Sequence, residues 1–425
     1  MQIIFWEKEI YFEESKTIEV TTIKFLGGCG EVGRSAVAVD SIALDYGIKP
    51  SSPPEFPLDF SPKAVLISHA HLDHVGFAPS LMDYDPKVYL TPPSIEIGRI
   101  LLYDSLNVMN PAPFSKREIR QFESNCIEVE YNEKLEVDGY SVEFLNAGHV
   151  PGSAMISLEN DVHILYSGDL KLEETRLLEG AERNIPEVDI LIVESTYFGV
   201  EHPERKELER KFVESVLETI DNKGHAIIPA FAVGRTQEVL MILESYGITP
   251  YVDGMGKDVF KILERHPDYV KDPKALRRAF KNAIWVEWKK REDVLKEPSA
   301  IVTTAGMLNG GPALFYISKL YNDPKSKLLI TGYQVEGTNG DLALKHGMIN
   351  LGNKIVKLKM SVEQYDFSAH SGDSQLKEFV RLAVNKGAEI VFTMHGEKCA
   401  EFANWIRENL NVEAYAPKNG DIFVI

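Results

Sequence analysis

The chain has 425 residues, of which 44% are hydrophobic and 26% charged, and its formal net charge is −18. This composition predicts an ordinary globular protein of two or three domains. The acidic balance argues against a broad nucleic-acid-coating surface, although a narrow basic cleft is compatible with it. No apolar run reaches the ~18–20 residues of a membrane span, and the N-terminus has no secretory pattern. The three cysteines are too few for a disulfide framework, so we expect a cytoplasmic protein with no membrane partner.

The N-terminal part of the chain is predicted to be rich in strands. Residues 1–21 are expected to form a short hairpin-like extension. The glycine-rich stretch 27–35 contains a G-x-G-x-x-G look-alike, but further strands are predicted at 36–39 and 42–45 in place of a helix. A dinucleotide site needs strand, loop and helix in that order, so we reject that interpretation.

The stretch Ser68-His69-Ala70-His71-Leu72-Asp73-His74 concentrates metal-ligand residue types. It follows an apolar run at 64–67 that is typical of a buried strand. Histidines two apart at a strand end point the same way, so we expect His69 and His71 to bind one metal ion. Asp73 and His74 follow where the backbone turns, and are expected to face a second ion. One such histidine is usually structural, but four ligand-type residues within six positions favour a metal site.

Further along the chain, a helix is predicted at 115–124 because Ser115 and Glu118 form a capping-box pattern. Three later predicted strands each lead to a polar residue, namely His149, Asp169 and Glu194. Functional side chains at the carboxyl ends of strands are typical of α/β scaffolds. From about residue 196 strands alternate with helices, which predicts an inserted parallel α/β domain.

These residues are sufficient for a two-zinc site. His69, His71 and His149 would bind one zinc ion, and Asp73, His74 and His395 the other. Asp169 would bridge the two ions. Such a pair of ions lowers the pKa of a shared water, and the resulting hydroxide can attack phosphorus in line.

The motif His69-x-His71-x-Asp73-His74, with His149 and Asp169, resembles the signature of the metallo-β-lactamase superfamily. Glu194, His370 and His395 match three further motifs of the β-CASP nucleases. The neighbouring segments agree, including 229–235, 305–312, 332–338 and 367–372. Within that family the chain is most similar to stand-alone archaeal nucleases of the cleavage and polyadenylation specificity factor (CPSF) type that lack KH domains.

The resemblance implies a metallo-β-lactamase αββα sandwich with an inserted parallel α/β β-CASP domain. The expected domains are the extension at 1–21, the first metallo-β-lactamase part at 22–198, the β-CASP domain at 199–346 and the second metallo-β-lactamase part at 347–425. It implies His370 as general acid, oriented by Glu194, and counts Asp73 as catalytic as well as metal-binding. Asp45 would support the ligand loop from behind, although a turn-capping role is the alternative.

The implied function is a zinc-dependent ribonuclease for single-stranded RNA, acting as an endonuclease, a 5′→3′ exonuclease or both. A homodimer or an RNA-processing complex is the expected assembly. The chain has histidine at position 395, as the RNA-acting members of the family do, whereas the DNA-repair branch typically has valine at the matching position. The alternatives are a DNA-acting β-CASP nuclease, a small-molecule hydrolase on the same scaffold and a non-catalytic RNA-processing scaffold.

Substrate contacts are expected outside the metal ligands. Arg235 opens a predicted helix where a phosphate is favoured, and Ser368 precedes the expected acid. Gly306, Gly310 and Gly311 are candidates to present backbone amides to phosphate, with turn formation as the alternative. The basic clusters at 277–281 and 289–291 are interpreted as solvated helix faces, with phosphate contact as the alternative.

Overall fold

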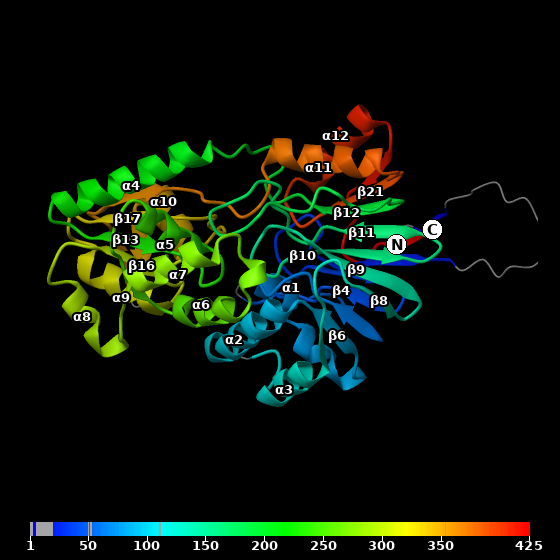
Figure 1. The fold of residues 1–425 in the computed structure, drawn as a ribbon, viewed down its shortest axis with the longest axis horizontal. Coiled ribbons are helices and arrows are strands. Elements are labelled where there is room, and N and C mark those ends of the chain that lie inside the picture. Colours follow the sequence, from blue (N-terminus) through cyan, green and yellow to red (C-terminus); the bar gives the residue numbers. More distant parts are fainter. Residues whose placement is uncertain (1–2, 6–19, 50, 52, 110–111, 353) are drawn as a thin grey trace, which may run out of the picture. The chain divides into compact units, whose positions relative to one another are not determined.

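The computed structural model describes residues 3–5, 20–49, 51, 53–109, 112–352 and 354–425 (Figure 1). The chain forms two compact units. Unit 1 comprises Met1–Glu173, Gly180–Glu201 and His370–Ile425, and unit 2 comprises Glu174–Glu179 and His202–Ala369. Each unit has its own sheet structure and its own hydrophobic core.

Unit 1 contains two sheets that share one core. In spatial order, the strands of the first sheet are β1 (Ile3–Phe5), β23 (Ile422–Val424), β2 (Thr22–Gly27), β3 (Ala36–Val39), β4 (Ile42–Leu44), β5 (Ala64–Leu66), β6 (Lys87–Leu90) and β7 (Cys126–Glu128). Those of the second are β22 (Glu413–Tyr415), β21 (Ile390–Met394), β12 (Ile190–Glu194), β11 (His163–Tyr166), β10 (Ala154–Glu159), β9 (Tyr140–Asn146) and β8 (Lys134–Val137).

Alternation along the strands produces the layers of unit 1. In β3, Val37 and Val39 belong to the core between the two sheets, whereas Ala36 and Ala38 pack in a second core on the outer face. That outer core also receives side chains from α1 (Leu72–Val75), the 3-10 helix η1 (Ala78–Tyr84), α2 (Pro92–Val108) and α3 (Lys116–Asn125). The other sheet is covered by α11 (Asp373–Asn385) and α12 (Cys399–Leu410) (Figure 1). The layers therefore run α, β, β, α, which confirms the predicted sandwich.

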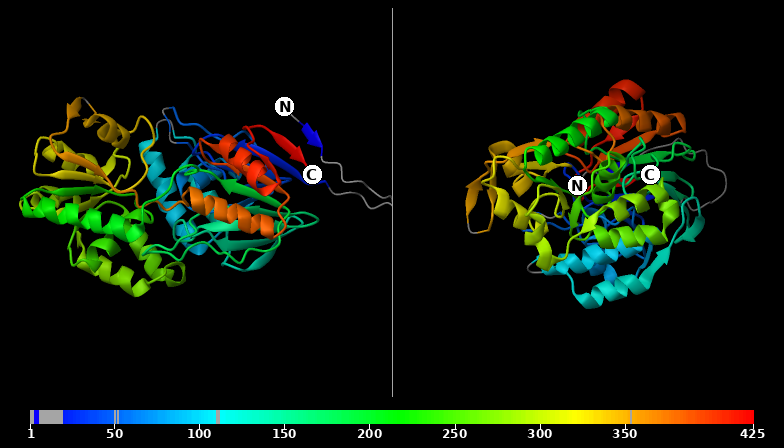
Figure 2. Two further views of the ribbon diagram at one scale, coloured as in Figure 1. Left: turned by 90° about the horizontal axis from the view of Figure 1, so that it is seen from above. Right: turned by 60° about the vertical axis from the view of Figure 1, so that its left-hand side comes forward.

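The C-terminal strand completes the first sheet. β23 lies between β1, to which it is parallel, and β2, to which it is antiparallel (Figure 2). The expected hairpin at 1–21 falls mostly on residues 6–19, which lie outside the described residues. The C-terminal segment of the chain thus belongs structurally to the first unit.

Unit 2 contains a six-stranded sheet in which all paired strands are parallel. Its spatial order is β15 (Ile284–Trp285), β14 (Tyr251–Asp253), β16 (Ala300–Thr303), β13 (Ala226–Pro229), β17 (Lys327–Ile330) and β20 (Ser361–Gln364). The α-helices of this unit are α4 (Arg205–Asp221), α5 (Arg235–Ser245), α6 (Gly256–Arg265), α7 (Pro273–Asn282), α8 (Arg291–Val294), α9 (Gly311–Leu320) and α10 (Asn339–His346). Short 3-10 helices η2 (Pro267–Tyr269) and η3 (Trp288–Lys290) and the hairpin of β18 (Met348–Asn350) with β19 (Ile355–Lys357) complete it. The predicted parallel α/β insertion is confirmed.

The unit boundaries differ from the sequence expectation at two places. β20 pairs with β17, so unit 2 extends to Ala369, whereas the sequence suggested a return near residue 347. The segment Glu174–Glu179 also groups with unit 2, because the buried Glu238 carboxylate accepts hydrogen bonds from the N–H groups of Arg176 and Leu177. Both differences arise from pairings between segments that are distant in the sequence.

Local signals were more successful. The side-chain oxygen of Ser115 accepts from the N–H of Glu118, and the Glu118 carboxylate accepts from the N–H of Ser115, so the predicted capping box is present at α3. Within the described ranges, the helices are too short or too polar to traverse a lipid bilayer. The three cysteines are all free thiols.

Candidate metal centre

The loop after β5 and the helix α1 that follows it carry four of the ligand candidates. β5 ends at Leu66, so His69 and His71 lie in this loop rather than on a strand, whereas Asp73 and His74 lie in α1. The alternation argument for His69 and His71 is therefore wrong, because it required an extended strand. Both side chains nevertheless reach the same group of ligand-type atoms.

Helix α1 is held by backbone contacts from the preceding loops. The N–H of Ser35 donates to the carbonyl of Asp73 at 2.8 Å, and the N–H of Tyr46 donates to the carbonyl of His74 at 2.7 Å. A Cβ at Gly47 would lie 1.8 Å from the Asp73 carbonyl oxygen, so a glycine is required at this close approach. These contacts fix the turn that presents Asp73 and His74.

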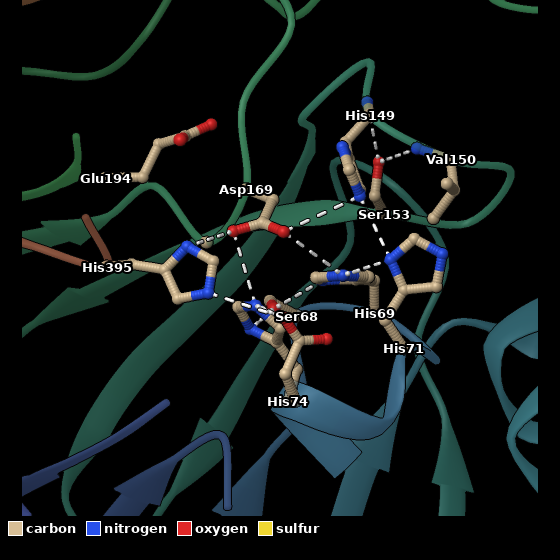
Figure 3. A network of polar contacts seen from close by, with 12 residues as sticks. Ser68, His69, His71, His74, His149, Val150, Ser153, Asp169, Glu194 and His395 are labelled. Carbon is tan, nitrogen blue, oxygen red and sulfur yellow. Dashed lines mark hydrogen bonds and ion pairs between the residues drawn. The ribbon is translucent and has the colours of Figure 1, made fainter. Parts of the chain in front are cut away.

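The first ligand group consists of His69, His71, His149 and Asp169, whose ligand-type atoms all lie within 4.8 Å of one another. Nδ1 of His71 lies 3.2 Å from Nε2 of His69 and 3.1 Å from Nε2 of His149. Oδ2 of Asp169 lies 3.6 Å from each of those two Nε2 atoms (Figure 3). Ligand atoms ~2.0–2.1 Å from a tetrahedral zinc ion are ~3.3–3.4 Å apart. The four measured edges are close to that spacing, so these residues fit a zinc ion.

The second ligand group consists of Asp73, His74, Asp169 and His395. Nε2 of His74 lies 3.2 Å from Oδ1 of Asp169, and Nε2 of His395 lies 3.5 Å from Oδ2 of Asp73. In the described part of the chain, Nε2 of His74, Nε2 of His395 and Oδ1 of Asp169 are buried without a hydrogen-bond partner. Buried polar atoms left in this way are costly unless a ligand satisfies them. A metal ion would satisfy all three, so this group fits one as well.

Asp45 lies behind the second ligand group. Its carboxylate accepts hydrogen bonds from the backbone N–H and the hydroxyl of Ser68, both at 2.7 Å, and from the hydroxyl of Tyr166 at 2.8 Å. It also lies 2.7 Å from Nδ1 of His74. A carboxylate on one ring nitrogen fixes the tautomer that leaves the other nitrogen free for a metal ion. Asp45 therefore directs Nε2 of His74 toward Asp169.

Electrostatics prepare the ligands for a cation. Burial, aided by the neighbouring His74, lowers the pKa of His69 well below its usual value, which keeps that imidazole neutral. Burial alone would raise the pKa of Asp169, but His395 and His74 outweigh it and hold that pKa well below its usual range. Metal ions bind neutral imidazole and ionised carboxylate, and these are the states that the surroundings favour for His69 and Asp169.

A carboxylate–imidazole pair lies beside the shared aspartate. Nδ1 of His370 is 3.0 Å from Oε1 of Glu194, and Nε2 of His370 is 3.8 Å from Oδ2 of Asp169. Burial alone would lower the pKa of His370, but the charges of Glu194 and Asp169 outweigh it and raise that pKa to about 9. The ring can thus hold a proton at neutral pH next to the metal ligands.

Three family models match consecutive parts of the chain. A metallo-beta-lactamase superfamily domain matches residues 59–192, a Beta-Casp domain matches 236–342, and a Zn-dependent metallo-hydrolase RNA specificity domain matches 355–417. Over 94% of this chain, it is 37% identical to "Probable RNase MJ4" of Methanocaldococcus jannaschii and 35% identical to "RNase aCSPSF2" of Saccharolobus solfataricus, covering 99% and 84% of those proteins.

The chain belongs to the β-CASP ribonuclease family of the metallo-β-lactamase superfamily. This confirms the resemblance identified from the sequence motifs and the prediction of a metal-dependent hydrolase. The "Transcription termination factor FttA" of M. jannaschii is 32% identical over 94% of this chain, which covers 71% of that protein. A protein of unknown function from Enterococcus faecalis V583 has a similar fold, with a TM-score of 0.62 at 17% identity over 96% of this chain and 100% of that one.

In this β-CASP protein, the expected substrate-contact residues all lie in unit 2. Arg235 is the first residue of α5 and its side chain is buried. Gly310 precedes α9 and Gly311 begins it, while a Cβ at Gly306 would lie 3.1 Å from the backbone nitrogen of Phe231. Ser368, near the end of the unit, is also buried. The metal ligands, Glu194 and His370 all belong to unit 1.

Lys171 is a functional candidate that sequence reasoning missed. It is 5% exposed, and its ammonium group donates to the backbone carbonyl of His370 at 3.0 Å. The neighbouring backbone adds support, because the N–H of Ser371 donates to the carbonyl of Leu170. Lysine is rarely buried, so its default assignment is the surface. Its position two residues after the ligand Asp169 was the available signal.

We expect Lys171→Met to lower kcat at least tenfold while leaving the metal content unchanged, because the backbone carrying His370 loses a charged donor. A tenfold loss corresponds to ~1.4 kcal/mol in the barrier. Steady-state kinetics and metal analysis of the purified variant measure both quantities, with Lys171→Arg as the variant that retains a cation. A folded Lys171→Met protein with the wild-type kcat would show that this contact does not position His370.

Proposed function

We propose that this chain hydrolyses phosphodiester bonds of single-stranded RNA with two zinc ions, one in each of the ligand groups that share Asp169. The observation that carries the proposal is the Glu194–His370 pair, because it puts a protonated imidazole 3.8 Å from the shared carboxylate. A proton donor beside a two-metal site is suited to in-line displacement at phosphorus.

Bound zinc ions would lower the pKa of water and neutralise charge on phosphate oxygens. The residues of the chain supply the remaining functions. Asp45 holds the His74 ring in the orientation for metal binding, and Asp169 brings the two ligand groups together. Asp73 contributes a carboxylate whose pKa is lowered despite burial, because the neighbouring imidazoles His395 and His74 stabilise its charge.

His370 acts as the general acid in this proposal. It gives its Nε2 proton to the leaving 3′ oxygen, which would otherwise depart as an alkoxide. Glu194 holds Nδ1 and stabilises the protonated ring. Cleavage of this P–O bond leaves a 5′-phosphate and a 3′-hydroxyl.

Two observations support RNA as the substrate. The relatives with 35–37% identity are named as RNases, and the C-terminal family model is named for RNA specificity. Arg235, Ser368 and the amides near Gly306, Gly310 and Gly311 are our proposed phosphate contacts. We further propose a cytoplasmic location, in keeping with an RNA substrate and three free thiols, and either a homodimer or an RNA-processing complex as the assembly.

Zinc-loaded protein is expected to cleave 5′-labelled single-stranded RNA, and His370→Ala to do so ~10²–10⁴-fold more slowly with its zinc retained. A time course separates the two modes of action. Mononucleotide at the first time points indicates 5′→3′ exonuclease action, and internal fragments indicate endonuclease action. Absence of RNA cleavage would overturn the proposal. Cleavage confined to single-stranded DNA or to small esters would then identify the alternative activity.

Metal counting tests the shared carboxylate. We expect Asp169→Ala to lose both zinc ions and His395→Ala to retain one, because only Asp169 belongs to both ligand groups. Elemental analysis after dialysis gives the stoichiometry, with His346→Ala as the control at a histidine outside both groups. Retention of both ions by Asp169→Ala would contradict the shared role.

The pH profile tests the Glu194–His370 pair. A general acid with a raised pKa is active below that pKa, so the rate falls as pH rises through it. Glu194→Gln removes the largest favourable charge on the His370 imidazolium, so the falling alkaline limb should move to lower pH. Initial rates between pH 5 and about 10 measure the shift, and an unmoved limb in a metal-replete variant would exclude Glu194 from this role.

A further inference from the structure

Trp288 has an exposed indole ring in an ordered part of unit 2. It is 70% exposed, whereas Trp285 and Trp405 are partly covered and pack against the rings of Phe280 and Phe402. An indole offers a large, rigid apolar face with a polar N–H at its edge, a surface on which a planar ligand can stack. In Trp288 most of that surface is open to solvent.

The backbone on both sides of Trp288 is well held. Before it, the N–H of Val286 donates to the carbonyl of Val252 at 2.9 Å, which extends the pairing of the edge strand β15 with β14. After it, the Arg291 guanidinium forms two hydrogen bonds, of 2.6 and 3.1 Å, with the buried Asp253 carboxylate. The hydroxyl of Tyr316 donates to the same carboxylate at 2.9 Å. The 3-10 helix η3, which carries the exposed ring, is therefore held in place by contacts on both sides.

The charges around the ring favour an anionic ligand. The ammonium group of Lys289 lies 5.4 Å from the centroid of the Trp288 ring, and Lys289 has no ion pair in the described part of the chain. The nearby acids Glu287 and Glu292 are each paired with a lysine, at 3.6 and 2.9 Å respectively. Among residues 287–292, Lys289 is therefore the charged side chain that has no ion pair in the part of the chain that the structure describes.

Trp288 lies at the edge of the unit 2 sheet at which α/β proteins commonly bind ligands. It follows the carboxyl end of β15, and the carboxyl ends of parallel strands form the edge at which α/β sheets bind ligands. Arg235 begins the helix after β13, three strand positions away along the same edge. Strands ~4.8 Å apart put the two strand ends ~14 Å from each other, a span that a few nucleotides of extended RNA can cover.

We infer that Trp288 and Lys289 form an accessory site for single-stranded RNA, with an unpaired base stacked on the indole and an adjacent phosphate bound by the ammonium group. Aromatic faces bind bases of any sequence and a neighbouring cation binds the backbone, which is how proteins hold single strands without sequence preference. One ring and one cation form too small a patch for a stable protein–protein interface, which buries ~1,200–2,000 Å². The identity of the ligand as RNA rests on the proposed function.

Binding measurements on full-length protein test this site. The measurements use a His370→Ala background, which slows cleavage during the titration. Fluorescence anisotropy then gives the Kd for a labelled oligouridylate of about fifteen nucleotides, a length within the ~4–16 that single-strand sites cover. Loss of base–aromatic stacking is worth ~1–3 kcal/mol, so Trp288→Ala should weaken binding about 5- to 150-fold. Trp288→Phe should restore most of the affinity, and Lys289→Gln should reduce the salt dependence of binding by about one phosphate contact.

The matched control is Tyr246→Ala. Tyr246 is 46% exposed, also in unit 2, and follows the C-terminal end of α5, away from the carboxyl edge of the sheet. This variant should bind the oligomer as the parent protein does. A duplex is the second control: every variant should bind it as the parent does, because its bases are already stacked on one another. A Trp288→Ala affinity within twofold of the parent, or a loss equal to that of Tyr246→Ala, overturns the inference.

The outcomes separate this inference from the proposed function. If the wild-type protein cleaves RNA but Trp288→Ala binds it normally, the proposed nuclease function stands and the accessory site is ruled out. If the wild-type protein binds single-stranded RNA through Trp288 but cleaves none, the proposed nuclease function is ruled out and the accessory site stands. Failure of the parent protein to bind single-stranded RNA overturns the inference directly.

Discussion

The carboxylate of Asp169 is the group around which unit 1 is arranged. Its oxygens lie 3.1–3.8 Å from ring nitrogens of five histidines, namely His69, His74, His149, His370 and His395. These residues come from segments that span more than three hundred positions of the sequence. A buried carboxylate surrounded in this way stays ionised, and it can serve two cations at once because each of its oxygens faces a different ligand group.

Three further buried charges keep that arrangement rigid. Asp45 fixes the His74 ring, Glu194 fixes the His370 ring, and Lys171 binds the backbone that carries His370. None of these three residues is a predicted metal ligand. Each instead holds a residue that lies at the candidate metal centre. Positioning of this kind decides whether ligands and proton donor are held in productive geometry.

Unit 2 has a different physical character. It is a parallel sheet whose carboxyl edge carries Arg235, Gly306 and the exposed ring of Trp288. The predicted metal ligands and the proposed acid–base pair Glu194–His370 all belong to unit 1. In the proposed function, chemistry and substrate binding are therefore divided between the units: the buried charges of unit 1 carry the chemistry, and the aromatic, amide and cationic groups of unit 2 contact the RNA. The overall charge of −18 is compatible with this, because RNA contacts need only local cations.

The sequence by itself determined the features that depend on local order. The residue types of 68–74 identified a metal site, and Ser115 with Glu118 identified the start of α3. The alternation of strands and helices after residue 196 identified the parallel insertion, and the distant motifs identified the family. Tertiary structure alone decided what depends on contacts between distant segments. It placed His69 and His71 on a loop, joined β20 to the sheet of unit 2, and buried Lys171 against His370. Those outcomes depend on pairings across many residues, which hydrophobic periodicity and capping signals do not encode.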